Sequence, residues 1–488
     1  MQVKSWFKKL VAGGLLATML AGCSLGGGSA PKPVEGSLKV VYYDEGSFFQ
    51  DFGMLFAALN EKIDIQVVTT QNLYRNRGDD PEFDYEKAYQ EFLEAEKPDL
   101  IMVDTSQYEK MASEGKLHDL EAFMAQEKFD TEGMIPGIVE HMKELGGGKT
   151  YGFPTTFSSQ VLYYNKSLFD KYNVDYPTDQ MTWSEVISLA KRFPTDGSDQ
   201  DRIYGLKMGW SDQFSQVVSM LAESEGLNYV NAAEKTMTIN TPGWKTVVET
   251  ALDAVNSKAL YVENNNFSGS QTYEDYLMRN PFISNRLAMT VDASYFMDEI
   301  KRAKEYFNEE GKTVEDWDLV TMPVSVQNPD QSSSTWYSNI FAISAQSTNK
   351  ELAWKFISYI ASEDYARVKA KTGFNGGFPV RTKYIKDEAG RNFEAFYKLR
   401  PASRNMYEGM DKLPRQFGFS FNSLMEEEFQ AIKEDKKTID EALGILQTKG
   451  EELLLQEPMS DEEIQKMIEE KYGNASGGGV IVEQAVSE

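Results

Sequence analysis

Two neighbouring stretches of the chain decide its fold: residues 148–154 read GKTYGFP, and residues 161–169 read VLYYNKSLF. The three glycines at 146–148 interrupt the pattern before them, and the residues from Tyr151 to Asn165 then predict an extended segment with Pro154 near its start. The chain has 488 residues, which is more than a single hydrophobic core usually supports. We therefore expect two lobes, with the first crossing between them in this segment.

Strands and helices alternate on the N-terminal side of this crossing. Leu38–Tyr43 is apolar and β-branched, Ser47–Lys62 carries apolar residues at helical spacing, and Ile63–Thr69 alternates apolar and polar residues. A helix at Asp84–Glu96 and a short apolar strand at Asp99–Val103 follow. This order predicts an α/β fold in which each lobe is a mainly parallel sheet flanked by helices.

The alternation continues on the C-terminal side. Thr182 and Glu185 carry the signature of a capping box at the start of a helix, and strands are predicted at Ile203–Met208 and Leu287–Val291. The last third of the chain is predicted to be helical. Its apolar residues share one helix face: Ile439, Ala442, Leu443, Leu446, Leu453 and Leu454.

The first residues predict a targeting segment. A cationic stretch with Lys4, Lys8 and Lys9 precedes an apolar run at 10–21 that is too short to span a membrane as a stable helix. Residues 20–23 (LAGC) resemble the lipobox of bacterial lipoproteins, in which the cysteine receives a diacylglyceryl group. The resemblance implies a signal peptide at 1–22, acyl chains such as palmitate on Cys23, and a flexible tether at 23–36. Residues 473–488 are expected to form a loose tail.

Composition narrows the function. Removing residues 1–22 takes away three of the 50 basic residues and none of the 76 acidic ones, so the formal charge changes from −26 to −29. A chain this acidic repels nucleic acid and anionic lipid. Cys23 is the only cysteine, which excludes disulfides and cysteine metal clusters, and His118 and His141 are the only histidines. Abundant aromatic residues favour stacking on a ligand over proton transfer.

Several stretches in order resemble the family 1 extracellular solute-binding proteins, which include maltose- and other oligosaccharide-binding proteins. The two stretches around the crossing are similar to the family's "GK-Y-G-P … L-YYNK-LF" segment. Residues 182–185 (TWSE) resemble a helix start of the family, residues 287–291 (LAMTV) its "AM" strand, and residues 347–356 its "S-N-ELAWKF" segment. The resemblance covers nearly the whole mature chain.

This resemblance implies a two-lobed, periplasmic-binding-protein-like fold with a hinge. We expect residues 37–153 plus 288–345 in the first lobe and residues 154–287 plus 346–472 in the second. It also implies capture of a carbohydrate, with an oligosaccharide favoured, in a cleft between the lobes, and delivery to the permease subunits of an ABC transporter. We expect a monomer at the outer face of the cell membrane that needs no cofactor or metal and is not an enzyme.

Two kinds of side chain suit a sugar, because aromatic rings stack on its C–H face and carboxylates or amides bind its hydroxyl rim. Position in the family pattern implies stacking by Trp210, Trp336 and Tyr337, and a cleft-facing place for Asp292. Acids that follow predicted strands are further candidates, since ligands bind beyond the carboxyl ends of parallel strands. The remaining candidates lie on these strand ends, beside the crossing and just before residues 378–381 (FPVR): Asp44, Glu45, Asp104, Phe153, Ser159, Asn375, Gly376 and Gly377.

Each candidate has a structural alternative: the aromatic residues can pack in the core, the acids can cap helices, and the glycines can serve a turn. Two other functions also stay open, namely a binding lipoprotein for a peptide, polyamine or other non-sugar solute, and a secreted glycan-degrading enzyme that uses paired carboxylates. Asp196, Asp199 and Asp201 miss the spacing of an EF-hand, so an ordinary turn is favoured over a calcium site.

Overall fold

A computed structural model of the protein describes residues 35–71, 73, 83–198, 201–209, 214–261, 272–371, 377–386, 389–402 and 412–472. The expected signal peptide, Cys23, most of the tether and the tail lie outside these residues. So do three candidate ligand residues, Trp210, Asn375 and Gly376, together with Asp199 of the possible calcium turn. The chain divides into two compact units, residues 1–99 with 348–353 and residues 100–347 with 354–488.

The first unit is built on one β-α-β unit. Strand β1 (Gly36–Tyr42) pairs in parallel with β2 (Ile63–Thr69) along their whole length. Between them lie α2 (Glu45–Phe48), a π-helical turn η1 (Phe49–Gly53) and α3 (Met54–Leu59), and α5 (Tyr85–Glu96) follows. Phe48, Phe52 and Phe56 are buried on this helical segment, which confirms the predicted order.

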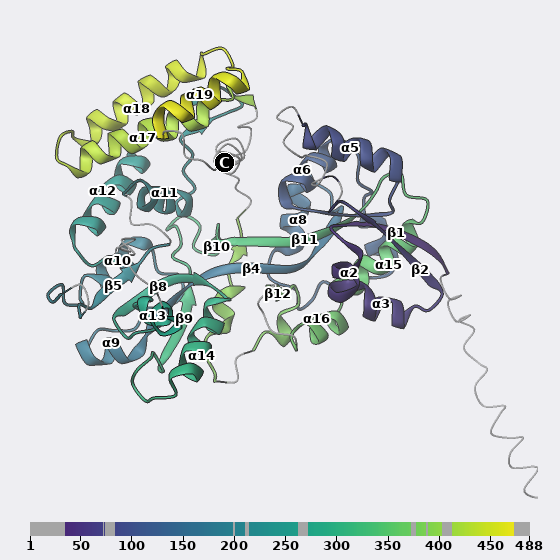
Figure 1. Ribbon diagram of the computed structural model, residues 1–488, viewed down its shortest axis with the longest axis horizontal. Helices are drawn as coiled ribbons and strands as arrows, with labels where there is room; N and C mark the ends of the chain where they lie inside the picture. Colours follow the sequence, from purple (N-terminus) through teal and green to yellow (C-terminus); the bar gives the residue numbers. More distant parts are fainter. Residues whose placement is uncertain are drawn as a thin grey trace, which may run out of the picture. The chain divides into compact units, whose positions relative to one another are not determined.

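The second unit is organised around one long strand, β4 (Gly152–Asn165), which confirms the extended segment predicted from the sequence. The strands run in the order β3-β11-β4-β8-β5, and β9 and β12 also pair with β4. Figure 1 shows β4 and β11 lying side by side. The bounds are β3 Leu100–Val103, β5 Tyr204–Lys207, β8 Leu287–Ala293, β9 Trp317–Thr321, β11 Thr335–Ile343 and β12 Phe378–Pro379.

The prediction of mainly parallel sheets is corrected by these pairings. Among the described strands of four or more residues, β1–β2 and β5–β8 are parallel, whereas β11, β8 and β9 all run antiparallel to β4 and β11 also runs antiparallel to β3. The later segments return along β4 in the opposite direction. Alternation of strands and helices along a sequence does not reveal whether strands from distant segments pair in parallel or antiparallel.

Helices and short elements complete the second unit. The capping box of Thr182 and Glu185 is confirmed at the start of α10, and Pro242 occupies the first turn of α12. The helices are α6 Thr105–Ser113, α7 Glu121–Gln126, α8 Ile138–Leu145, α9 Lys166–Tyr172, α10 Trp183–Ala190, α11 Phe214–Ser224, α12 Pro242–Asn256, α13 Tyr273–Arg279, α14 Phe296–Phe307, α15 Lys350–Ile360, α16 Glu363–Lys369, α17 Phe417–Lys433, α18 Ile439–Leu454 and α19 Asp461–Tyr472. The short elements are β6 Val230–Asn231, β7 Thr236–Met237, β10 Gln331–Ser332, β13 Arg400–Pro401 and the 3₁₀ turns η2 Thr382–Tyr384 and η3 Phe393–Phe396.

The core of the second unit joins segments that lie far apart in the chain. One buried cluster joins Trp183 of α10, Leu206 of β5, Met289 of β8, Val320 of β9 and Phe421 of α17. Residues 288–322 therefore pack with the segment 154–287 and not with 37–153, because β8 is a sheet neighbour of β5. The two-lobed division with a hinge stays a prediction.

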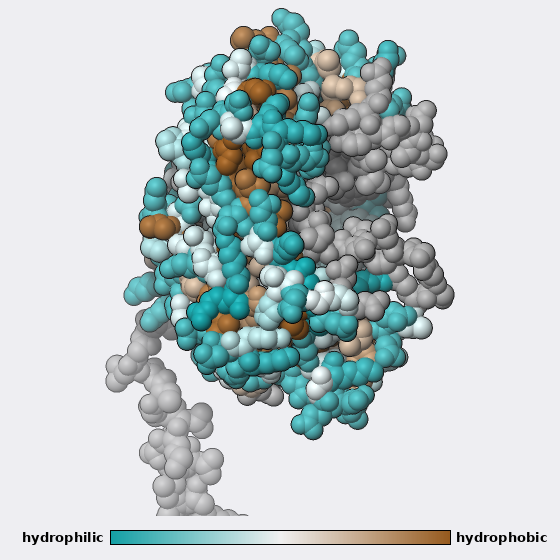
Figure 2. Space-filling view, turned by 90° about the vertical axis from the view of Figure 1, so that its left-hand side faces the viewer, coloured by the Kyte–Doolittle hydropathy of each residue, from teal (hydrophilic) through white to brown (hydrophobic). Residues whose placement is uncertain are grey.

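The helix α15, which follows β11, packs near the other edge of this sheet, beside β3 and β11. Trp354 of α15 stacks on Phe123 with ring centres 5.7 Å apart, and Phe356 contacts Phe341 of β11 at 5.2 Å. Residues 354–360 thus pack against elements that flank β3 and β11, although the sequence placed them in the second lobe. No described helix combines the length and the apolar content that crossing a membrane requires. Figure 2 shows a face covered mostly by hydrophilic residues, in keeping with the net charge of −26.

Candidate functional site

One face of β4 carries a row of polar side chains in the middle of the sheet. Ser158 and Gln160 are partly exposed, whereas their neighbours Phe157, Ser159 and Val161 are buried. Successive side chains of a strand point to opposite faces, so Ser158 and Gln160 share a face. That face is therefore the one on which β4 can meet a ligand.

The adjacent strand β11 places an aromatic ring on the same face. Trp336 lies directly opposite Ser158, and Ser338 lies opposite Thr156. Trp336 is 44% exposed, which is unusual for a tryptophan in a strand that lies between two others, as β11 does between β3 and β4. We call Thr156, Ser158, Gln160, Trp336 and Ser338 the crossing-strand face.

Two observations describe the surroundings of the crossing-strand face. One of its hydroxyl groups has no hydrogen-bond partner in the described part of the chain, and the turn before β12 comes close to Ser158. The hydroxyl oxygen of Thr156 is buried and has no hydrogen-bond partner among the described residues. Gly377 has a φ of +89°, and a Cβ there would lie 2.8 Å from the carbonyl oxygen of Phe157 and 3.1 Å from Oγ of Ser158. The turn before β12 thus approaches Ser158 as closely as glycine allows.

Tyr337, the neighbour of Trp336, points the other way. It is buried, and its hydroxyl lies 3.0 Å from Nδ1 of His141 on α8. Burial lowers the pKa of His141 and raises the pKa of Tyr337, so both side chains are neutral near pH 7. The pair holds β11 against α8.

A second group of polar side chains lies at the carboxyl ends of β5 and β8. Lys207 ends β5 and is paired in parallel with Thr290, and Asp292 lies two residues further along β8. Tyr295 donates a hydrogen bond to the carboxylate of Asp292, and Glu299 follows one turn later in α14. We call Asp292, Tyr295 and Glu299 the acidic cluster.

Burial dominates the electrostatics of the acidic cluster. It raises the pKa of Asp292 to about 6, although the backbone N–H of Ala293 at 2.8 Å, the Tyr295 hydroxyl and the charge of Lys207 all act in the opposite direction. Burial also raises the pKa of Glu299, and Lys207 again opposes it. Gln160 is paired with Ala293, whereas Asp292 is paired with Val161, so the side chain of Asp292 lies on the opposite face of the sheet from the crossing-strand face.

Two of the predicted acids cap helices. The carboxylate of Asp44 accepts hydrogen bonds from the backbone N–H of Ser47 at 2.9 Å and from its hydroxyl at 2.6 Å, and these bonds lower the pKa of Asp44. Asp104 forms a capping box with Gln107 at the start of α6. Glu45 is the exposed first residue of α2. Ligand contact by these three acids stays a prediction.

The other described candidates lie in the core or the turn. Phe153 is fully buried against Phe129, with ring centres 5.4 Å apart. Ser159 is buried, and its hydroxyl donates to the carbonyl oxygen of Gln160 at 3.2 Å. The structure thus brings Trp336 and Gly377 together beside Ser158, whereas Asp292 lies on the opposite face of the sheet. Sequence reasoning missed Thr156, Ser158, Gln160, Ser338, Tyr295 and Glu299.

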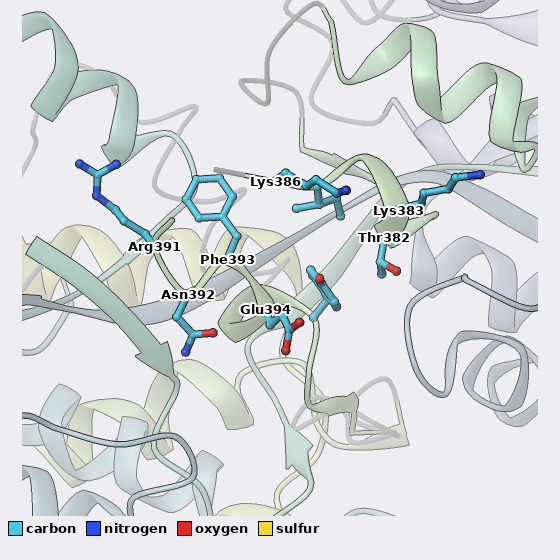
Figure 3. A pocket seen from close by; sticks show the side chains of 9 residues that line it. Thr382, Lys383, Lys386, Arg391, Asn392, Phe393 and Glu394 are labelled. Atoms are coloured by element: carbon cyan, nitrogen blue, oxygen red, sulfur yellow. The ribbon is translucent and has the colours of Figure 1, made fainter. Parts of the chain in front are cut away.

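A pocket of about 540 Å³ lies over η2 and η3 and carries three basic side chains, Lys383, Lys386 and Arg391. Two of them are already engaged. Lys383 Nζ lies 2.6 Å from Glu363, and the Arg391 guanidinium lies 3.9 Å from the centre of the Trp317 ring. Figure 3 shows the Lys383 and Arg391 side chains pointing apart. The pocket therefore does not gather positive charge for an anion.

The side chains of the crossing-strand face suit a small polar solute, because an exposed indole ring has hydroxyl and amide groups beside it. No group of three or more His, Cys, Asp or Glu among the described residues is placed to hold a metal ion. The sequence profile of the bacterial extracellular solute-binding proteins matches residues 43–367. The chain belongs to this family.

Relatives agree with this membership. A binding protein of Brucella abortus (strain 2308) is 25% identical over 316 residues, which make up 63% of this chain and 69% of that protein. The sugar-binding protein MalE of Xanthomonas citri has a similar fold, with a TM-score of 0.59, 15% identity and coverage of 90% of this chain and 100% of that chain. An ABC substrate-binding protein of Listeria monocytogenes, in complex with cycloalternan, has a TM-score of 0.50 and 20% identity, and the match covers 89% of this chain and 99% of that chain.

Proposed function

We propose that the protein captures a carbohydrate, with an oligosaccharide as the favoured ligand, and delivers it to the permease of an ABC transporter. The observation that carries the proposal is the exposed ring of Trp336 within a row of hydroxyl and amide side chains. A pyranose offers an apolar face to such a ring and a rim of hydroxyls to such a row. Burial of roughly 60 Å² of apolar surface stabilises each stack by about 1.5 kcal/mol.

Further support comes from the relatives. The protein of Xanthomonas citri is described as sugar-binding, and that of Listeria monocytogenes as an ABC substrate-binding protein in complex with cycloalternan. Neither exceeds 20% identity to this chain, so they support a shared fold and leave the ligand of this chain to experiment.

In this proposal Trp336 stacks on the sugar, and Thr156, Ser158 and Gln160 bind its hydroxyls. Ligand contact by Asp292, on the opposite face of the sheet, stays a prediction. The other candidates predicted from the sequence complete or support the site: Asp44, Glu45, Asp104, Phe153, Ser159, Trp210, Tyr337, Asn375, Gly376 and Gly377. Ligand favours a closed arrangement of the two lobes because only there do both contact it.

The protein acts outside the cell in this proposal. Cys23 carries the lipid that anchors a monomer to the outer face of the membrane, and the signal peptide is removed. The protein is a binding protein and not an enzyme. A single membrane-buried acyl chain binds reversibly, so the lipid on Cys23 needs two or more chains for stable anchoring.

A second candidate ligand is a polyamine or another cationic solute, favoured by the acidic cluster. Ionised Asp292 and Glu299 together would attract a cation, whereas a neutral sugar needs only hydrogen bonds from them. The two candidates differ in salt dependence, because screening weakens the attraction between charges.

A thermal-unfolding screen of the chain from Ser24 onward against oligosaccharides, peptides and polyamines tests the proposal. A ligand at 100 times its dissociation constant adds about 2.7 kcal/mol of stability. We expect stabilisation by one class of oligosaccharide, and loss of at least tenfold in affinity for Trp336→Ala. Leu455→Ala is the control, because this residue is 86% exposed and distant in sequence from the crossing-strand face.

Three results contradict the proposal or a part of it. Stabilisation by peptides or polyamines alone keeps a binding protein and removes the carbohydrate. Hydrolysis of an added oligosaccharide replaces capture with catalysis. Unchanged affinity of Trp336→Ala for a sugar that does bind moves the site elsewhere.

A further inference from the structure

Three tyrosine rings form an exposed group on α13 and α14, apart from the crossing-strand face. Tyr273 and Tyr276 of α13 are 49% and 52% exposed, and Tyr306 of α14 is 52% exposed. The rings of Tyr273 and Tyr276 are nearly parallel, 18° apart with centres separated by 6.2 Å, and Tyr306 meets Tyr273 edge-on at 5.2 Å. We call these three residues the tyrosine platform; Figure 1 shows α13 and α14 next to each other.

The helix beneath the tyrosine platform is held in place. A capping box of Thr272 and Asp275 fixes the start of α13, and Leu277 anchors its inner side in the core. An ion pair between Glu274 and Lys312, 3.1 Å long, ties α13 to the segment after α14. Rings presented on a fixed helix lose little entropy when a ligand binds, which favours a binding role.

The chemistry of the platform suits a sugar chain. Tyrosine combines a flat apolar ring with a hydroxyl, and the C–H face of a pyranose stacks on such a ring while its hydroxyls bond to the rim. Charged residues at the edge, among them Glu274, Asp275 and Lys312, keep the surroundings polar. Rings this exposed in a polar setting contact a ligand that is itself amphipathic.

The size of the platform separates a sugar chain from a protein partner. Three half-exposed tyrosines offer roughly 300 Å² of surface, at 150–250 Å² for a complete ring side chain. A stable protein interface buries about 800 Å² on each partner and has an apolar centre free of charges. The platform is too small for such an interface and large enough for a few sugar units.

We propose that the tyrosine platform is a second carbohydrate-binding site, which holds a long glycan at the protein surface while the crossing-strand face captures the transported sugar. The inference rests on the proposed function for its choice of ligand, but its residues are separate. A glycan held there raises the local concentration of sugar ends near the protein, as linked binding sites do in general.

Affinity electrophoresis tests the proposal with the full mature chain in native gels that contain soluble starch, xylan or galactomannan. We expect one polysaccharide to retard the wild type, and the double variant Tyr273→Ala with Tyr306→Ala to lose at least fivefold of that retention. Tyr176→Ala is the matched control, because Tyr176 is also exposed, at 39%, and lies in the segment between α9 and α10 and not on α13 or α14. Thermal unfolding confirms that the double variant is folded.

The outcome separates this inference from the proposed function. Trp336→Ala should lose capture of short oligosaccharides and keep the retention in the gel, whereas the tyrosine variant should do the reverse. Retention of the wild type by none of the three polysaccharides overturns the platform, and so does equal retention of the double alanine variant. A variant with Tyr273→Trp in place of Tyr273→Ala has an aromatic ring at this position again. Recovery of gel retention by this variant supports stacking on the ligand over loss of structure.

Discussion

Replacement of Asp292 by asparagine should make the protein more stable at neutral pH. Burial raises the pKa of Asp292 to about 6 in the folded chain, against a usual value of 3.8. A difference of one pH unit between folded and unfolded pKa values corresponds to about 1.4 kcal/mol, so ionised Asp292 costs up to about 3 kcal/mol at pH 7. Since the side chain is mostly buried but keeps some contact with solvent, we expect a gain of about 1–3 kcal/mol for Asp292→Asn.

The sign of the pH dependence follows from the raised pKa. Below about pH 4 the carboxyl group is protonated in both states and costs nothing. Between about pH 4 and pH 6 the folded state binds more protons than the unfolded state, so the stability of the wild type falls as pH rises. The asparagine variant lacks this loss, and its advantage should therefore grow from near zero at pH 4 to its full value above pH 7.

Urea unfolding of both proteins at pH 4.5, 6 and 7.5 measures this advantage as a difference, in which the other titrating groups cancel. The matched control is Glu305→Gln, because Glu305 is exposed on α14, the helix that follows β8, and lies 4.0 Å from Lys301 in a surface ion pair. It should shift stability by less than about 0.5 kcal/mol at every pH. An advantage of Asp292→Asn that does not change with pH, or a loss of stability at pH 7.5, would refute the reasoning.

Two further substitutions test buried contacts. Lys437→Met should destabilise the protein by about 2–4 kcal/mol in urea unfolding, because Lys437 Nζ lies 2.6 and 2.7 Å from the two oxygens of the fully buried Glu428 carboxylate. Lys436→Met is the control and should change the stability little, because Lys436 forms an exposed ion pair with Glu434. Equal effects of the two substitutions would contradict a special role for the buried pair. Gly377→Ala should cost at least about 1 kcal/mol and weaken ligand binding, since φ is +89° and the new methyl group meets Phe157 and Ser158. An unchanged midpoint and affinity would remove Gly377 from the site.

Local patterns in the sequence predicted the elements well. The β-α-β order at 38–69, the extended segment 151–165 and the capping box at Thr182 all follow from neighbours a few residues apart, and the structure confirms them. The caps at Asp44 and Asp104 were equally visible in the sequence. Asp104 with Gln107 three residues later is a capping-box pattern, which predicts the helix cap that the structure shows at the start of α6.

Pairing between distant segments could not be predicted in the same way. Trp336 and Tyr337 are adjacent and chemically alike, and only the register of β11 on β4 decides that Trp336 is exposed while Tyr337 reaches His141. One step in that register would exchange them. The pairing of β8 with β5 could not be predicted for the same reason, because the paired residues lie 83 positions apart in the chain and no local signal links them.

The uneven exposure of the tryptophans gives the protein an optical signal of its own. Among the described tryptophans, Trp336 is 44% exposed, while Trp183, Trp244, Trp317 and Trp354 are no more than 6% exposed. Light emitted by a hydrated indole has a longer wavelength than light from a buried one, and dissolved quenchers such as acrylamide reach it more easily. A solute that stacks on Trp336 should therefore shift the emission to the blue and protect it from quenching, so binding can be followed without a label.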